Sequence, residues 1–156
     1  FNIVHLKEGE GIFQDAGIPH AYLRGQNVEL MACSDNVIRG GLTPKYVDIV
    51  ELLKIVDFRE VITQIISAAS QNQSEFTYKT PVNDFALAQI RVEPEQHTKV
   101  NLQSAGILLV MRGELKIQEK SATLTLKQGE SAFITADSNV EIMSEKGGYA
   151  FLAKLP

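Results

Sequence analysis

The sequence predicts a mostly β protein, made of an antiparallel jelly roll and part of a second, similar β unit. From Phe76 to the end of the chain, short strand-like segments are separated by turn residues at even intervals, which is typical of β-sandwiches and jelly rolls. A turn pattern near the start of the chain recurs 120 residues later. This recurrence predicts that the two ends of the chain belong to β units of the same kind.

Length and composition are those of an ordinary globular protein. The chain has 156 residues, 44% hydrophobic and 22% charged, which allows one good core or one domain plus part of another. The net charge is -4, and the basic residues form no run, which argues against a nucleic-acid partner and an anionic membrane surface. No apolar run approaches the length of a membrane span, and no signal peptide is visible.

The single cysteine and the first residues suggest a setting for the chain. Cys33 cannot form an internal disulfide, which is consistent with a reducing, cytoplasmic location. It lies in an apolar, strand-like context without a neighbouring base, so we interpret it as a core residue. The chain begins at Phe1, not at methionine, within the strand-like run FNIVHL. We therefore expect the N-terminal part of a longer protein to be missing.

The first third of the chain predicts strands, turns and one helix. FNIVHLK alternates and NVELMAC is apolar, which favours two strands, and glycine and proline punctuate the stretch between them. Around residue 48 the apolar period changes. Asp48 can cap a helix, with Glu51 three residues on, and an apolar face follows. A short helix is therefore predicted over residues 48–56.

The next segment predicts a linker. REVITQIISAASQNQ is rich in β-branched residues, which suits an extended crossing strand, although its spacing also allows a helix. SAASQNQS is polar and suggests a boundary. We predict three parts: the truncated end of the first β unit over 1–45, a helix and linker over 46–74, and the jelly roll over 75–156.

Nine strands are predicted in the jelly roll. ELKIQEK and ATLTLK alternate cleanly, which predicts one buried and one exposed face. GILLVM is apolar throughout, which predicts burial on both faces. The nine segments are EFTYKT, FALAQIRV, TKVNLQ, AGILLVMRG, ELKIQEK, ATLTLKQG, SAFITA, VEIMSE and YAFLAKL.

The recurring turn carries a histidine in one copy only. Val140 stands where His20 would be in the second copy. Gly9, Gly17 and His20 are similar to the second histidine motif of the cupin family, G-x5-P-x-G-x2-H, with Asp15 in the proline slot. A neutral imidazole at such a turn can bind zinc or a similar divalent ion. His20 is therefore either a metal ligand or a structural residue after a turn. The repeated residues are Lys7, Gly9, Glu10, Phe13 and Ala16, which correspond to Lys127, Gly129, Glu130, Phe133 and Ala136.

The run PHAYLRGQNVELMACSDNVIRGGLTPKYVD, residues 19–48, resembles type I mannose-6-phosphate isomerase, the zinc-dependent phosphomannose isomerase. Members of this family carry H-A-Y-L-x-G, then E-x-M-A-x-S-D-N-V-x-R-x-G-x-T-P-K. PVNDFAL and LKQGESAFI are also similar to the C-terminal domain of bacterial members. The resemblance implies the C-terminal portion of an isomerase that interconverts mannose 6-phosphate and fructose 6-phosphate through a cis-enediol, with one Zn2+ ion.

The resemblance also implies roles for individual residues. His20 becomes a zinc ligand and Arg39 the catalytic arginine near the reacting carbons. Zinc can act as a Lewis acid, and an arginine is always protonated, so it can stabilise an enediolate or a phosphate. Carboxylates suit proton transfer when burial raises their pKa. The remaining pocket residues are Glu29 and Asp35 as catalytic carboxylates, and Tyr22 and Lys45 as substrate-binding residues.

Each of these roles has a competing structural interpretation. Arg39 can pair with Asp35, four residues earlier, and Glu29 can lie on a solvated strand face. Lys45 follows Pro44, where turn residues are common, and Tyr22 can be a packed, hydrogen-bonded tyrosine. His5 and His97 are interpreted as ordinary strand or surface residues.

The second β unit lacks metal ligands in its motif. The first cupin motif expects H-x-H and a later glutamate, but Lys99 occupies the second histidine slot after His97, and Gly106 the glutamate slot. We therefore expect residues 75–156 to be a metal-free structural domain. The family binds zinc through a glutamine, two histidines and a glutamate, of which His20 supplies one. This chain alone is thus expected to bind zinc poorly and to be inactive.

One alternative function and one open question remain. The alternative is a non-catalytic, cupin-like sugar-binding or assembly module. The oligomeric state is left open, because exposed strand edges could promote association.

Overall fold

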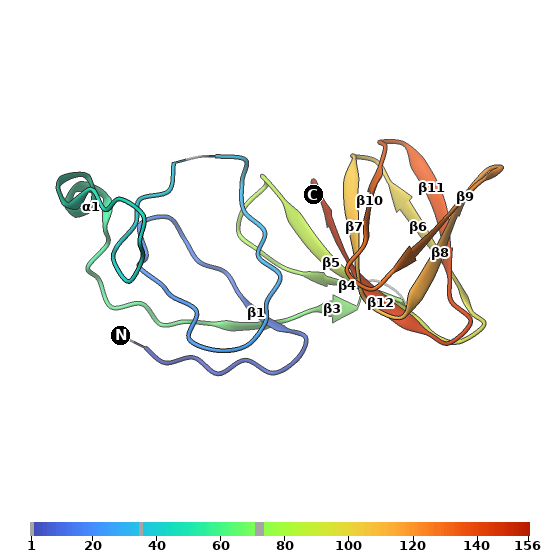
Figure 1. The fold of residues 1–156 in the computed structure, drawn as a ribbon, viewed down its shortest axis with the longest axis horizontal. Helices are drawn as coiled ribbons and strands as arrows, with labels where there is room; N and C mark the ends of the chain where they lie inside the picture. The colour runs from blue at the N-terminus through green and yellow to red at the C-terminus, as the bar shows by residue number, and fades with distance from the viewer. Residues whose placement is uncertain (1, 35, 71–73) are drawn as a thin grey trace.

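The computed structural model describes residues 2–34, 36–70 and 74–156. Figure 1 shows two regions side by side along the longest axis of the molecule. The N-terminal residues form long loops with a short helix at one end, and the C-terminal residues form a strand-rich body at the other. The prediction of a mostly β chain with an antiparallel jelly roll and a short helix is confirmed.

The C-terminal body is a sandwich of two antiparallel sheets. One sheet has six strands in the order β10-β7-β12-β5-β4-β3, and the other has four in the order β6-β11-β8-β9. All nine strands predicted from residue 76 onward are present. Their bounds are β4 Glu75–Tyr78, β5 Ala86–Val92, β6 His97–Leu102, β7 Gly106–Arg112, β8 Glu114–Glu119, β9 Ala122–Lys127, β10 Ser131–Ile134, β11 Ser138–Met143 and β12 Gly148–Lys154.

The core lies between the two sheets and is almost entirely aliphatic. Alternate residues of each strand face inward, as the period of two predicts. Burying these side chains supplies most of the stabilisation of the sandwich. Fully buried side chains of the core are Ile90, Val100, Leu108, Val110, Leu115, Ile142 and Leu152.

Strand β7 differs from its prediction. GILLVM was expected to be buried on both faces, but it alternates: Leu108 and Val110 are fully buried, whereas Ile107 is 51% exposed. The apolar residues on the second face lie on the outside of the six-stranded sheet, which is only partly covered there. An apolar run therefore does not require two covered faces, because folded proteins tolerate exposed apolar side chains.

The N-terminal region contains fewer strands than predicted. Among the described residues before the helix, β1, Glu10–Ile12, is the only strand, and it pairs with β2, Ile65–Ser67. FNIVHLK and NVELMAC were both expected to be strands, and this is wrong for the described residues. A strand needs a neighbour for its ladder of hydrogen bonds, and no such ladder forms along these two runs among the described residues, although the Asn2 side chain donates to the Val61 carbonyl oxygen at 2.6 Å. Of the two alternatives for residues 59–73, the extended one is confirmed where the structure describes the segment.

The predicted helix is present as α1, Ile49–Ile55. Asp48 is its N-cap, and the Asp48 carboxylate accepts a hydrogen bond of 3.0 Å from the backbone N–H of Glu51. None of the helical residues is buried, so the expected apolar face is largely exposed. No described helix is long and apolar enough to cross a membrane.

The two regions meet on the outer face of the six-stranded sheet. The Tyr78 hydroxyl donates to the Gly9 carbonyl oxygen at 2.9 Å, and the Tyr149 hydroxyl donates to Glu8 at 3.4 Å. The linker also adds strand β3, Ala69–Ser70, to the sheet beside β4. The boundaries at residues 45/46 and 74/75 stay a prediction.

Candidate metal and substrate site

The sequence repeat is also a structural repeat. Gly9 and Gly129 adopt φ angles of +84° and +85°, a region that favours glycine. The backbone N–H of Glu10 donates to the Lys7 carbonyl at 3.0 Å, and that of Glu130 to the Lys127 carbonyl at 2.9 Å. Each glutamate carboxylate also accepts from the backbone N–H of its lysine, at 2.8 Å and 2.7 Å. The two turns therefore share one geometry, and a strand follows each of them.

The turn before His20 is fixed against the end of helix α1. Gly17 has a φ of +77°, and a Cβ atom at this position would lie 2.7 Å from the carbonyl oxygen of Ile55. The backbone N–H of Asp57 donates to the Gly17 carbonyl at 2.8 Å. A larger residue at position 17 would force these two backbones apart. The start of the chain and the end of the helix thus jointly position the segment that carries His20.

His20 is exposed, and one of its ring nitrogens is already engaged. Its Nδ1 lies 3.0 Å from the carbonyl oxygen of Ile18. A carbonyl oxygen only accepts, so Nδ1 carries the proton and Nε2 keeps a free lone pair. A carbonyl partner of this kind is the usual way to orient a metal-binding imidazole. The donor chemistry of His20 therefore suits a zinc ligand that binds through Nε2.

Tyr22 lies beside His20, and Glu29 interacts with Tyr22. The rings of His20 and Tyr22 pack edge to face, with 5.9 Å between their centroids. Partial burial raises the pKa of Tyr22, and a hydrogen bond to Glu29 and the negative charge of Glu29 raise it further, while Asn27 opposes them. Tyr22 is nevertheless 61% exposed, so the burial covers only part of the ring. Three of the six predicted site residues thus form one connected group.

The other predicted site residues are not joined to this group by a direct contact. Arg39 and Lys45 are exposed, and neither has an ion pair with any described residue. The backbone N–H of Lys45 donates to the Thr43 hydroxyl at 3.2 Å, which is a local turn contact. Asp35 lies outside the described residues, so its catalytic role and its pair with Arg39 stay predictions.

No complete metal site is present in the described part of the chain. Within it, no group of three or more His, Cys, Asp or Glu side chains is arranged to hold an ion. His20 therefore needs further ligands from elsewhere. Cys33 was expected in the core and is exposed, so that prediction is wrong. The reason is that NVELMAC forms no strand here and packs into no sheet.

The second β unit has an apolar interior where a metal cage would lie. Thr98, Val100 and Leu102 face inward from β6, and buried Val140 pairs with Val100. His97 and Lys99 face outward, so the motif slots at these positions point away from the interior. His97 instead lies 3.4 Å from a Glu141 carboxylate oxygen, as expected for a surface residue.

A cleft that the sequence did not reveal lies where the two regions meet. It has a volume of about 600 Å³ and lies between the Glu8–Gly9 turn and one end of the six-stranded sheet. Three cationic side chains line it: Arg91, Arg112 and Lys146. No motif marks these residues, because strand register brings Arg91 and Arg112 together and the connection between β11 and β12 adds Lys146.

Comparison with known proteins identifies the family. Residues 74–146 match the family model described as mannose-6-phosphate isomerase, cupin domain. The mannose-6-phosphate isomerase of Salmonella typhimurium is 42% identical over 139 residues, and that of Bos taurus 36% identical over 149. These alignments cover 88% and 90% of this chain. The chain belongs to the mannose-6-phosphate isomerase family.

A solved mannose-6-phosphate isomerase has the same fold. The Salmonella typhimurium enzyme, crystallised with fructose 6-phosphate and zinc, superposes with a TM-score of 0.65 at 37% identity over 80% of this chain. The chain spans about a third of the length of its relatives: 35% of the Salmonella typhimurium and Bos taurus proteins and 32% of the superposed structure. The resemblance inferred from residues 19–48 is thereby confirmed.

Proposed function

We propose that this chain is the C-terminal portion of a zinc-dependent mannose-6-phosphate isomerase and that it supplies His20 to the zinc site of the intact enzyme. The substrates would be mannose 6-phosphate and fructose 6-phosphate. Support comes from relatives of that name and from the related enzyme whose structure holds zinc and fructose 6-phosphate. In this proposal residues 1–45 complete the catalytic β unit, residues 46–74 link it, and residues 75–156 form a domain without metal.

The observation that carries the proposal is the state of the His20 ring. The ring follows a turn built like that of the second β unit, but only this copy places an imidazole there. The Ile18 carbonyl fixes Nδ1–H and leaves Nε2 free to bind an ion. Zinc, when bound there, would polarise a sugar oxygen as a Lewis acid.

The remaining residues would act on the substrate. Glu29 and Asp35 would carry the proton between the two carbons, and Arg39 would stabilise the negative charge that develops on oxygen. Tyr22 and Lys45 would bind the sugar phosphate. Solved variants of the Salmonella typhimurium enzyme include alanine replacements of a glutamate and an arginine that lie ten residues apart. Glu29 and Arg39 have the same separation.

The location follows from the same proposal. A single free cysteine and a phosphorylated substrate both suit the cytoplasm, where we place the intact enzyme.

Steady-state kinetics of the intact enzyme that contains this chain would test the catalytic roles. Arg39→Ala should lower kcat by at least about a hundredfold if the guanidinium stabilises the transition state. Arg59→Ala is the matched control, since Arg59 is exposed and pairs only with Asp57 among the described residues. A loss in Arg39→Ala of less than about tenfold, or about 1.4 kcal/mol, would contradict the role. If Arg39→Ala loses little activity and Glu29→Gln loses none, a non-catalytic module is favoured.

A further inference from the structure

We propose that the cleft between the Glu8–Gly9 turn and the six-stranded sheet binds the phosphate group of a small phosphorylated metabolite, through Arg91, Arg112 and Lys146. None of these residues belongs to the set proposed for the isomerase reaction. The cleft is therefore a second ligand site, and its existence does not depend on the proposed function.

Strand register places the two arginines on either side of one tyrosine. Tyr149 of β12 is the cross-strand partner of Arg91 on β5 and of Arg112 on β7. The three residues thus form a row across adjacent strands on the outer face of the sheet. The Arg112 guanidinium carbon lies 5.2 Å from the centre of the Tyr149 ring, and that of Arg91 lies 4.6 Å from the Phe76 ring. Stacking on aromatic rings orients both cations without neutralising them.

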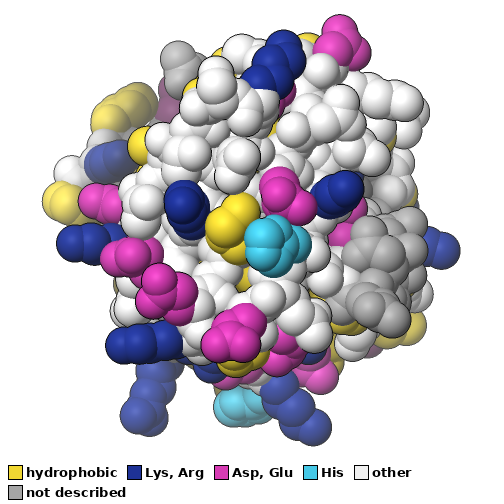
Figure 2. All heavy atoms as spheres, turned by 90° about the vertical axis from the view of Figure 1, so that its right-hand side faces the viewer, with side chains coloured by type: hydrophobic (Ala, Val, Ile, Leu, Met, Phe, Trp, Pro, Cys, Tyr) yellow, Lys and Arg dark blue, Asp and Glu magenta, His cyan; other side chains and the backbone are white. Residues whose placement is uncertain are grey.

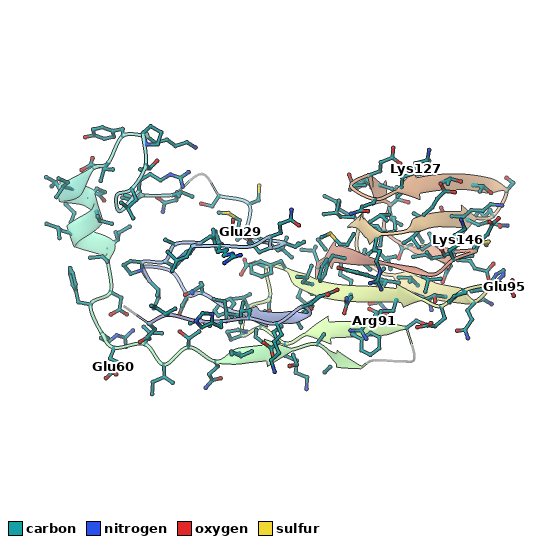
Figure 3. All side chains as sticks on the ribbon, turned by 60° about the horizontal axis from the view of Figure 1, so that its bottom comes forward. Glu29, Glu60, Arg91, Glu95, Lys127 and Lys146 are labelled. Carbon is teal, nitrogen blue, oxygen red and sulfur yellow. The ribbon has the colours of Figure 1, made fainter. Side chains whose placement is uncertain are left out.

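Close backbone contacts hold the lysine beside this row. Gly147 follows Lys146 in the connection between β11 and β12, and Gly148 begins β12. A Cβ atom at Gly148 would lie 2.5 Å from the carbonyl oxygen of Arg112. A Cβ atom at Gly113 would lie 2.6 Å from the carbonyl oxygen of Gly147. Only glycine allows these backbones to approach so closely. Figure 3 shows Arg91 and Lys146 on the sandwich, remote from Glu29 in the N-terminal region.

The positive charge of the cleft is not balanced by ion pairs. Among the described residues, the ion pairs involve none of the three cations. Among the described residues, the Arg91 side chain donates only to the neutral side-chain oxygen of buried Gln89, from Nε at 3.2 Å and Nη2 at 3.0 Å. Glu8 and Glu93 are the carboxylates that line the cleft, and Glu8 accepts from Tyr149. Three cations thus face two carboxylates in a chain whose net charge is -4.

The donors match a phosphate better than a carboxylate. Each guanidinium offers a planar fork of N–H groups and the ammonium offers three more, which exceeds what two carboxylate oxygens can accept. A phosphate group presents three terminal oxygens and up to two charges. The cleft, at about 600 Å³, is large enough for a sugar attached to that group. The half-buried Tyr149 ring gives the sugar an apolar wall.

The cluster is also local. Figure 2 shows the end of the sandwich opposite the N-terminal region, where acidic and basic side chains are interspersed and no basic stripe forms. The lining of the cleft itself holds three cations and two carboxylates, which suits a small anion and not the long backbone of a nucleic acid.

Titration by NMR of the full chain at low ionic strength would test the site. Inorganic phosphate and mannose 6-phosphate are the probes, and unphosphorylated mannose is the neutral control. Either phosphate-containing probe should shift the amide signals of Gly147, Gly148 and Tyr149, while mannose alone should not. Tighter binding of mannose 6-phosphate would identify a phosphorylated sugar as the ligand class. Equal binding of the two probes would show that the phosphate group alone is recognised.

Three variants make the test specific. Arg112→Gln and Lys146→Gln should each weaken binding by about tenfold or more, because each removes a charge-assisted donor. Lys116→Gln removes the same charge from the outer face of the other sheet and should bind normally. Lys146 lies in an exposed turn, so its variant keeps the fold even if Arg112→Gln does not. Absence of shifts with both phosphate probes, or equal binding in Lys146→Gln and Lys116→Gln, would overturn the proposal.

Discussion

The Tyr78 hydroxyl donates a hydrogen bond of 2.9 Å to the carbonyl oxygen of Gly9, across 69 residues of sequence. Tyr78 belongs to the sandwich, and Gly9 belongs to the turn that precedes strand β1. The Tyr78 ring also lies 3.6 Å from the position that a Cβ atom would take at Gly11. This contact therefore fixes the N-terminal β unit on the outer face of the six-stranded sheet.

Removing the Tyr78 hydroxyl should loosen this junction. Tyr78→Phe should lower the free energy of unfolding by about 1 kcal/mol, because the Gly9 carbonyl loses its donor. Urea denaturation followed by circular dichroism measures the change. Tyr46→Phe is the control, since Tyr46 is 82% exposed and should change stability little. Equal effects of the two substitutions would mean that the bond contributes nothing.

Stability should fall in alkaline solution because of the same residue. Burial raises the pKa of Tyr78 above its usual 10.0, and neighbouring Tyr149 adds to this, while the positive charge of Arg91 opposes it. The unfolded chain therefore loses this proton at lower pH than the folded chain. The contribution of the Tyr78 proton to the free energy of unfolding is fully present below pH 10. It is lost as the pH rises through the pKa of Tyr78 in the folded chain.

Comparing two pH values isolates this contribution. Between about pH 9 and about pH 11, the unfolding free energy of the unmodified chain should fall more than that of Tyr78→Phe. Lysines and the other tyrosines titrate in both proteins, so they cancel in the difference. An equal fall in the unfolding free energy of both proteins would contradict the raised pKa of Tyr78.

Neighbouring residues on β7 test the alternation of this strand. Leu108 is fully buried, and Leu108→Ala should cost about 2–5 kcal/mol through lost burial and a cavity. Ile107 is 51% exposed on the other face, and Ile107→Ala should cost about 0.5 kcal/mol or less. Chemical denaturation of both variants measures the contrast. A similar, large loss of unfolding free energy in both variants would mean that β7 is buried on two faces, as the sequence predicted.

Local patterns predicted most of the sandwich. Alternation and turn residues were enough to predict its nine strands, because both signals lie within each strand and its flanking turns and do not depend on which strands pair. The helix was predictable because its cap is local, with Asp48 binding the N–H of Glu51. The repeated turn was visible because the hydrogen bonds between the lysine and the glutamate three residues later are local in each copy.

Features that depend on distant partners were not predictable in this way. FNIVHLK and NVELMAC have the composition of strands, but a strand also requires a neighbour, and sequence does not show one. Cys33 was misplaced for the same reason. The cationic cleft was missed because Arg91 and Arg112 meet Tyr149 only through the order of strands in the sheet. For the site, the family motif supplied the residues, and the contacts of His20 with Ile18 and Tyr22 emerged only from the structure.

The zinc content of the intact enzyme that contains this chain, measured in purified His20→Ala and His97→Ala variants, tests the central claim most directly. The two substitutions are chemically identical, and both histidines are exposed in this structure. We predict that His20→Ala loses its zinc and its isomerase activity together, while His97→Ala retains both. A His20→Ala enzyme that keeps one zinc ion per polypeptide would contradict the assignment of His20 as a ligand.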